Sequence, residues 1–200
     1  GGMITTNNKE VYMQLIRLRS HGVNKVNDSF MNKKEAYDKN NIPNLWYYEM
    51  QELGYNYRLT DIQSSLGISQ LNRIDKFLIK RKKLVKRYLS KLQYFKNCKP
   101  AQDVNINNSA NHLFIISIDF KTIGKSRNQV MRELKENHIG TQVHYIPVPL
   151  HPYYQKFNYN IKDYSESIKY YRSCLSIPLY YSLTFREQDY VIECLKKIIG

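Results

Sequence analysis

The fold is decided by one stretch, Glu52-Leu53-Gly54-Tyr55-Asn56-Tyr57-Arg58-Leu59-Thr60-Asp61-Ile62-Gln63. Its last four residues fit a capping box, in which the Thr60 and Gln63 side chains each bond to the other residue's backbone amide. Downstream, apolar residues recur at three- and four-residue spacing, at Leu71, Ile74, Leu78, Val85, Tyr88 and Leu92. This spacing is typical of one apolar helix face and predicts a helix of about nine turns over residues 61–96, interrupted on that face only by Arg81.

Asn56 and Arg58 lie just before the start of this helix. Free amides and the helix dipole favour anions at a helix N-terminus, and Asn and Arg side chains add donors for phosphate oxygens. The alternative is that Asn56 only forms a turn and Arg58 pairs with a surface carboxylate. The spacing alone leaves both interpretations open.

Upstream of this stretch, Met3–Thr6 is expected to end a strand, and Asn7 or Asn8 to cap a helix that stops at Gly22. Residues 24–50 show weak periodicity and are expected to form a long irregular excursion.

Downstream, the polar stretch Asn97–Ala110 is expected to be a linker. The remaining chain alternates strands and capped helices, which predicts a small α/β domain. The expected strands are His112–Phe120, Thr141–Tyr145 and Cys174–Ile177, and the helices follow Ser126 and Thr184.

His144 and Tyr145 leave an expected strand for a loop stiffened by prolines, a position that often displays binding groups. A buried, hydrogen-bonded histidine is the alternative. His144 and His151 do not fall side by side in either a helix or a strand, so no metal site is expected. The three cysteines lie far apart, which favours reduced thiols in a cytoplasmic protein.

The net charge of +14 raises the question of a nucleic-acid partner. The densest basic run, Lys76–Arg87, has no interleaved aromatic platform, so a solvated basic face is the favoured interpretation and no nucleic acid is expected. No apolar run approaches the ~18 residues that a membrane span requires. The start Gly1-Gly2-Met3 lacks a signal peptide and suggests that some sequence precedes it.

These motifs, in this order, resemble the DegT/DnrJ/EryC1/StrS family of sugar aminotransferases over essentially the whole chain. The most specific match is 52–63, followed by Leu66-Gly67 and Gln70-Leu71. The others are Gly1–Asn7, Arg17-Leu18-Arg19-Ser20-His21-Gly22, Gly140–Tyr145 with Pro147, Leu150 and His151, and Leu175–Leu179. Within the family, the motifs look most like the branch that acts on UDP-linked 4-keto-6-deoxy-N-acetylhexosamines on the route to pseudaminic acid.

The resemblance implies an α/β fold-type I enzyme that uses pyridoxal 5'-phosphate. Residues 1–60 would be the end of the large cofactor domain, 61–96 a long connecting helix and 97–200 the small C-terminal domain. The family's members are homodimers with shared active sites.

The resemblance also implies roles for single residues. Asn56 would reach the cofactor phosphate of the neighbouring subunit, and Arg58, His144 and Tyr145 would lie near the substrate cleft. The Schiff-base lysine would lie upstream of Gly1, so no catalytic residue is assigned and the chain alone is expected to be inactive.

The implied reaction moves an amino group from an amino-acid donor, glutamate, to the 4-keto group of a nucleotide-diphosphate sugar. Two alternatives stay open. One is a dehydratase of the same family, in which histidine replaces the lysine. The other is a non-enzymatic basic module that binds nucleic acid.

Overall fold

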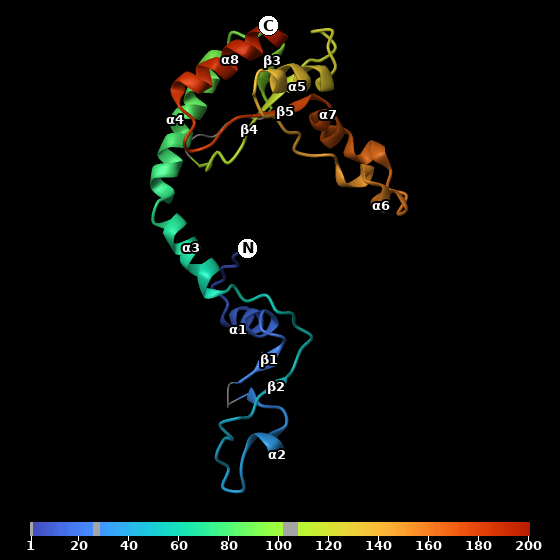
Figure 1. Ribbon diagram of the computed structural model, residues 1–200. Helices are drawn as coiled ribbons and strands as arrows, with labels where there is room; N and C mark the ends of the chain where they lie inside the picture. The colour runs from blue at the N-terminus through green and yellow to red at the C-terminus, as the bar shows by residue number, and fades with distance from the viewer. Residues whose placement is uncertain (1, 26–28, 102–107) are drawn as a thin grey trace. The chain divides into compact units, whose positions relative to one another are not determined.

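The computed structural model describes residues 2–25, 29–101 and 108–200 of the chain (Figure 1). The chain divides into two compact units, one ending at Leu71 and the other running from Asn72 to Gly200. Each unit is described by itself below.

The first unit is built from short elements. Helix α1 (Lys9–Leu18) begins at Asn8, whose side chain accepts hydrogen bonds from the amides of Glu10 and Val11. Strands β1 (Val23–Asn24) and β2 (Glu49–Met50) pair antiparallel, and between them lies only the single-turn helix α2 (Lys33–Ala36) among the described residues. The expected cap and the expected irregular excursion are therefore both confirmed. The strand expected at Met3–Thr6 is wrong, because these residues form no regular element.

The helix expected over 61–96 is two helices, α3 (Asp61–Leu71) and α4 (Ile74–Leu92). Leu71 and Ile74 are both exposed, so packing does not hold the N-terminal half of the apolar stripe in a continuous helix. The stripe is buried only farther along α4, at Leu84, Val85, Tyr88 and Leu92. Apolar spacing thus correctly predicted that α4 is a helix. It could not show that, among the described residues, no side chain of the apolar face is buried before Leu84.

The second unit is organised around a three-stranded antiparallel sheet in the order β3-β4-β5. Strand β4 (Phe114–Ile118) lies between β3 (Cys98–Pro100) and β5 (Cys174–Ile177). Alternate β4 side chains are fully buried, at Phe114, Ile116 and Ile118. Because side chains alternate across a strand, these three define the face that packs into the main core.

Helices α4, α5 (Arg127–Glu136) and α8 (Phe185–Ile199) supply the other side of this core, and α4 and α8 run alongside each other in Figure 1. Tyr88 of α4 stacks on Phe114 with ring centroids 4.9 Å apart, and its hydroxyl donates to the Pro178 carbonyl at 2.8 Å. Ser126 and Thr184 form the capping boxes that begin α5 and α8, as expected.

Arg81 interrupts the apolar stripe of α4 because its guanidinium ties loops to the helix. It donates to the carbonyls of Asn111, His112 and Leu179 at 3.2, 2.9 and 3.1 Å. Lys80 and Arg87 from the same basic run lie over the Phe185 ring. Part of the run therefore packs within the unit, which supports the structural interpretation of these charges.

Two expectations for the second unit are wrong. Thr141–Tyr145 is not a strand, because only Gln142 bridges to Ser176. The start of the stretch 97–110 is strand β3 rather than a linker, while 102–107 lie outside the described residues. Four further helical segments were not expected from the sequence: η2 (Val148–Leu150), α6 (Pro152–Gln155), η3 (Ile161–Tyr164) and α7 (Ser165–Ser173).

Candidate functional site

Two glycines bring the segment that carries Asn56 against the end of α1. Gly22 has φ +70°, the left-handed region that favours glycine, and a Cβ there would lie 1.7 Å from the Glu52 carbonyl oxygen. A Cβ on Gly54 would lie 2.2 Å from the Gly22 nitrogen. Both contacts are with backbone atoms, so neither could be relieved by rotating a side chain.

Backbone hydrogen bonds then hold residues 55–57 along residues 18–21. Tyr55 donates to the Leu18 carbonyl at 3.1 Å and accepts from the His21 amide at 3.0 Å. Tyr57 donates to the Arg19 carbonyl at 2.9 Å. Asn56 is consequently fixed opposite Ser20 in an antiparallel bridge.

The side chains of this short ladder alternate between its two faces. Tyr55 and Tyr57 are stacked, with ring centroids 5.4 Å apart and planes 20° apart. Asn56 lies between them in the chain and is exposed. Its carboxamide has no hydrogen-bond partner among the described residues, so its donor and acceptor are both available to a ligand.

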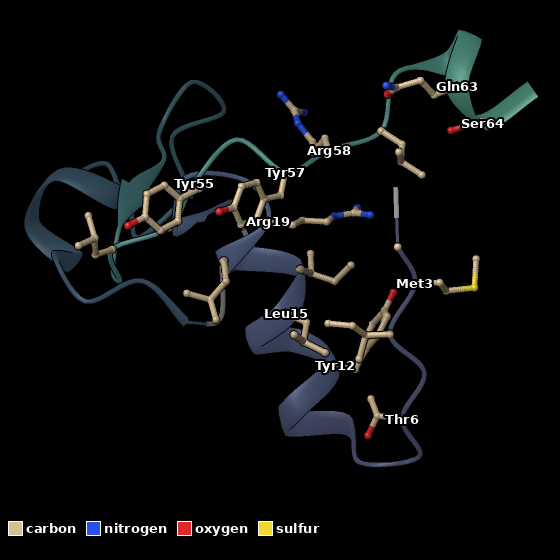
Figure 2. Close-up of a pocket in the computed structure, with 17 residues that line it drawn as sticks. Met3, Thr6, Tyr12, Leu15, Arg19, Tyr55, Tyr57, Arg58, Gln63 and Ser64 are labelled. Carbon is tan, nitrogen blue, oxygen red and sulfur yellow. The ribbon is translucent and has the colours of Figure 1, made fainter. Parts of the chain in front are cut away.

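A large open cavity of about 1210 Å³ lies beside this ladder in the first unit. Figure 2 shows the Arg19 side chain extending from the end of α1 toward the N-terminal segment that carries Met3. Among the residues that the structure describes, two arginines and three tyrosines line this cavity, but no Asp, Glu or Lys does. It consists of Gly2, Met3, Ile4, Thr6, Tyr12, Leu15, Ile16, Leu18, Arg19, Leu53, Gly54, Tyr55, Tyr57, Arg58, Leu59, Gln63 and Ser64.

The two arginines that line the cavity, Arg19 and Arg58, form no ion pair with a carboxylate of the described residues. Arg17, one residue from Leu18, is paired instead with Glu52, its Nη2 lying 2.6 Å from the carboxylate oxygen. Arg19 and Arg58 have no carboxylate partner in the part of the chain that the structure describes. A cavity with two free guanidinium groups and no acid favours an anionic occupant.

The N-terminus of α3 contributes less to this potential than the sequence suggested. Thr60 and Gln63 form the expected reciprocal bonds at 2.9 and 3.3 Å, so the Gln63 amide is already satisfied. Asp61 places a carboxylate in the first turn, which offsets the positive end of the helix dipole. Arg19 and Arg58, rather than the helix end, carry the positive charge here.

His144 and Tyr145 belong to the second unit. The Nδ1 atom of His144 lies 2.6 Å from the Ser176 hydroxyl, which fixes the ring against β5. Tyr145 is exposed, and its ring meets that of His144 edge-on with centroids 4.5 Å apart. His144 is hydrogen-bonded but only half-buried, so it matches the alternative interpretation in part, whereas the Tyr145 side chain is exposed.

The structure thus holds Asn56 next to Arg58 in the first unit and His144 next to Tyr145 in the second. That the two pairs serve one site stays a prediction. Sequence reasoning did not single out Arg19 as a cavity residue, although its position in Arg17-Leu18-Arg19 at a helix end was visible. Within the described ranges, no group of three or more His, Cys, Asp or Glu residues could hold a metal ion, and no helix there is long and apolar enough to cross a membrane.

Comparison with known proteins gives a consistent result. The model of the DegT/DnrJ/EryC1/StrS aminotransferase family matches residues 1–196. The chain is 34% identical to the spore coat polysaccharide biosynthesis protein SpsC of Bacillus subtilis over 201 residues, covering 100% of this chain and 49% of the relative. It is 31% identical to the UDP-4-amino-4,6-dideoxy-N-acetyl-beta-L-altrosamine transaminase of Campylobacter jejuni, covering 100% of this chain and 48% of that enzyme.

Among solved structures, the chain is similar to Helicobacter pylori PseC, an aminotransferase involved in the biosynthesis of pseudoaminic acid. The TM-score is 0.80 at 25% identity, over 97% of this chain and 47% of that one. The likeness confirms the α/β fold class expected from the sequence. The chain spans about half the length of the curated relatives it matches.

Proposed function

Because this chain belongs to the DegT/DnrJ/EryC1/StrS aminotransferase family, we propose that it forms part of a nucleotide-sugar aminotransferase. The enzyme would use pyridoxal 5'-phosphate to move an amino group from glutamate to the 4-keto group of a UDP-linked 4-keto-6-deoxy-N-acetylhexosamine. The similarity to the Campylobacter transaminase and to PseC supports this choice of substrate.

The observation that carries the proposal is the presentation of Asn56. Its backbone is fixed by the ladder to Ser20, and its carboxamide has no partner among the described residues. A rigid backbone with a free carboxamide is pre-organised to donate to a phosphate oxygen, since little conformational entropy is lost on binding. The neighbouring Arg58 guanidinium adds positive charge without a competing carboxylate.

These residues therefore fit the phosphate of pyridoxal 5'-phosphate. When bound, this cofactor supplies the electron sink that amino transfer needs. Asn56 would hold the phosphate by hydrogen bonding. Arg58 would orient the anionic substrate, and Tyr145 would bound the substrate cleft.

The proposed assembly is a homodimer in which Asn56 of one subunit reaches the cofactor phosphate bound by its neighbour. No lysine lines the large cavity within the described part of the chain.

The test is cofactor binding by the whole natural protein with Asn56→Ala. Loss of one hydrogen bond to a charged phosphate is expected to weaken pyridoxal 5'-phosphate binding about tenfold, measured by cofactor absorbance during dialysis. Asn7→Ala is the matched control, because Asn7 is exposed, as Asn56 is, and caps no helix.

Two results would contradict the proposal. Unchanged cofactor affinity in Asn56→Ala would remove the role of Asn56. Failure of the wild-type protein to form 2-oxoglutarate from glutamate with a UDP-4-keto sugar would remove the reaction itself.

A further inference from the structure

A second cavity of about 490 Å³ opens in the first unit and shares part of its lining with the large one. Its size falls within the range of roughly 300–1,000 Å³ that is typical of small-molecule sites. The basic side chains that line it are Arg17, His21, Lys25 and Arg58, and its described lining includes no Asp or Glu. Arg58 lines both cavities.

The register of the short sheet brings Lys25 to one wall of this cavity. Val23 pairs with Met50 and Asn24 with Glu49, so the next position along the antiparallel pair sets Lys25 opposite Tyr48. The Lys25 ammonium lies 5.5 Å from the centroid of the Tyr48 ring. This cation–π contact holds the long lysine side chain at the cavity without neutralising its charge.

The nearest acid in sequence, Glu49, is committed elsewhere. Side chains alternate along the strand, so Glu49 faces away from Tyr48. Its carboxylate accepts from the Asn32 amide at 3.1 Å, the Tyr47 hydroxyl at 2.8 Å and the Gln51 amide at 2.6 Å. The hydrogen bond from the Met31 amide, together with these three, lowers the pKa of Glu49 to about 2. Glu49 therefore stays ionised in its own loop and does not pair with Lys25.

Arg17 adds no net charge to the cavity, because Glu52 pairs with it at 2.6 Å. Lys25 and Arg58 remain, and neither has a carboxylate partner in the described ranges. Two cations from different segments thus converge on one small cavity. Two neighbouring phosphoryl groups match these two cations better than one carboxylate does, since each phosphoryl group can accept a charge-assisted hydrogen bond from one of them.

We propose that this cavity binds the diphosphate of the nucleotide sugar, with Lys25 and Arg58 donating to its oxygens and Tyr48 positioning Lys25. The inference deepens the function proposed above and rests on it. Since Arg58 lines both cavities, it would link the diphosphate subsite to the larger cavity beside Asn56.

The experiment measures UDP binding to the whole natural protein by titration calorimetry, with Lys25→Gln and Tyr48→Leu as variants. Lys25→Gln is expected to raise the Kd for UDP about tenfold, through loss of a charge-assisted bond, and Tyr48→Leu about threefold. The slope of log Kd against log salt should fall in Lys25→Gln only. Lys39→Gln is the matched control, because it removes one exposed lysine from the same excursion and lines neither cavity.

Two further arms separate the sources of phosphate. Affinity for pyridoxal 5'-phosphate should be unchanged in Lys25→Gln. In Lys25→Gln, the KM for the UDP sugar should rise by the same factor as the Kd for UDP, while kcat stays within about twofold of wild type. This pattern is expected when the lost contact stabilises the bound substrate and the transition state equally.

UDP affinity in Lys25→Gln within twofold of wild type would overturn the inference. The inference would also be overturned if Lys25→Gln lost affinity for pyridoxal 5'-phosphate but still bound UDP normally, because the cavity would then hold the cofactor phosphate. If wild-type protein binds UDP through Lys25 but transfers no amino group, the diphosphate subsite stands and the proposed reaction fails.

Discussion

Replacing Gly54 with alanine tests the close backbone approach that fixes Asn56. The new Cβ would lie 2.2 Å from the Gly22 nitrogen and 2.7 Å from the Leu18 carbonyl oxygen, both backbone atoms. Residues 54–57 must then move away from the end of α1. Three backbone bonds join these segments, from Tyr55 to Leu18, from His21 to Tyr55 and from Tyr57 to Arg19.

The size of the effect follows from those bonds. At about 0.5–1.5 kcal/mol each, losing the three destabilises the ladder by roughly 1.5–4.5 kcal/mol. A local loss of about 2 kcal/mol corresponds to about 30-fold faster amide hydrogen exchange when exchange follows local opening. Gly54→Ala should therefore accelerate exchange in the peptides that contain His21 and Tyr55, measured by mass spectrometry.

Gly67→Ala is the control for this substitution. Gly67 lies inside α3, and a Cβ there meets no atom within 4 Å. Alanine is preferred over glycine inside a helix by about 0.5–1 kcal/mol, so this variant should slow exchange in α3 or leave it unchanged. Equal exchange at His21 and Tyr55 in wild type and Gly54→Ala would refute the close-approach argument.

Three other predictions concern separate parts of the chain. Hydrogen bonds, the strongest from the Met31 amide, hold the pKa of Glu49 at about 2, below its usual 4.5. Protection of residues 29–51 against amide hydrogen exchange should therefore be complete above about pH 4.5 and lost as pH falls toward 2. Glu49→Gln should abolish this pH step in hydrogen exchange, and a step that persists in the variant would contradict it. Burial raises the pKa of the Cys98 thiol to about 12, so iodoacetamide at pH 8 should label it only after unfolding, as read by mass spectrometry; labelling in the native protein would count against its place in the core. Because the chain spans about half the length of the curated relatives it matches, the 200 residues alone are expected to show no amino transfer in a glutamate-dependent assay. Turnover that is abolished by mutating one of its own lysines would disprove this.

Local polar motifs predicted the structure better than apolar spacing did. The capping boxes at Thr60, Ser126 and Thr184 all form, because each depends only on residues three apart. The long helix over 61–96 failed because burial of a stripe depends on what packs against it. Leu71 and Ile74 have the right spacing but are exposed.

Edge pairing was the least predictable feature. Strand β3 lies in a stretch that contains Pro100, and it pairs only on the side of β4. Proline is compatible with such an edge, since it need not donate to a second neighbour. Thr141–Tyr145 shows the reverse case, where β-favouring residues form one bridge at Gln142 and then leave the sheet. In both cases tertiary position decided between strand and loop.

The segment that carries Asn56 could be singled out from the sequence by its resemblance to the family, and its geometry is set by backbone contacts rather than by a core. In the described part of the first unit, Phe30 and Ala36 are the only buried apolar side chains, and α1 has no buried residue. Position is instead enforced by the approach of Gly22 to Gly54 and by the ladder that holds Asn56. Such devices need particular residues at particular places, so they leave a readable motif. The contact between Lys25 and Tyr48 leaves no such motif. The two residues meet only through the register of β1 and β2, and the irregular sequence between these strands does not reveal that register. A motif therefore predicted Asn56, proposed to meet the cofactor, and Arg58, whereas Lys25, proposed to meet the diphosphate together with Arg58, required the structure.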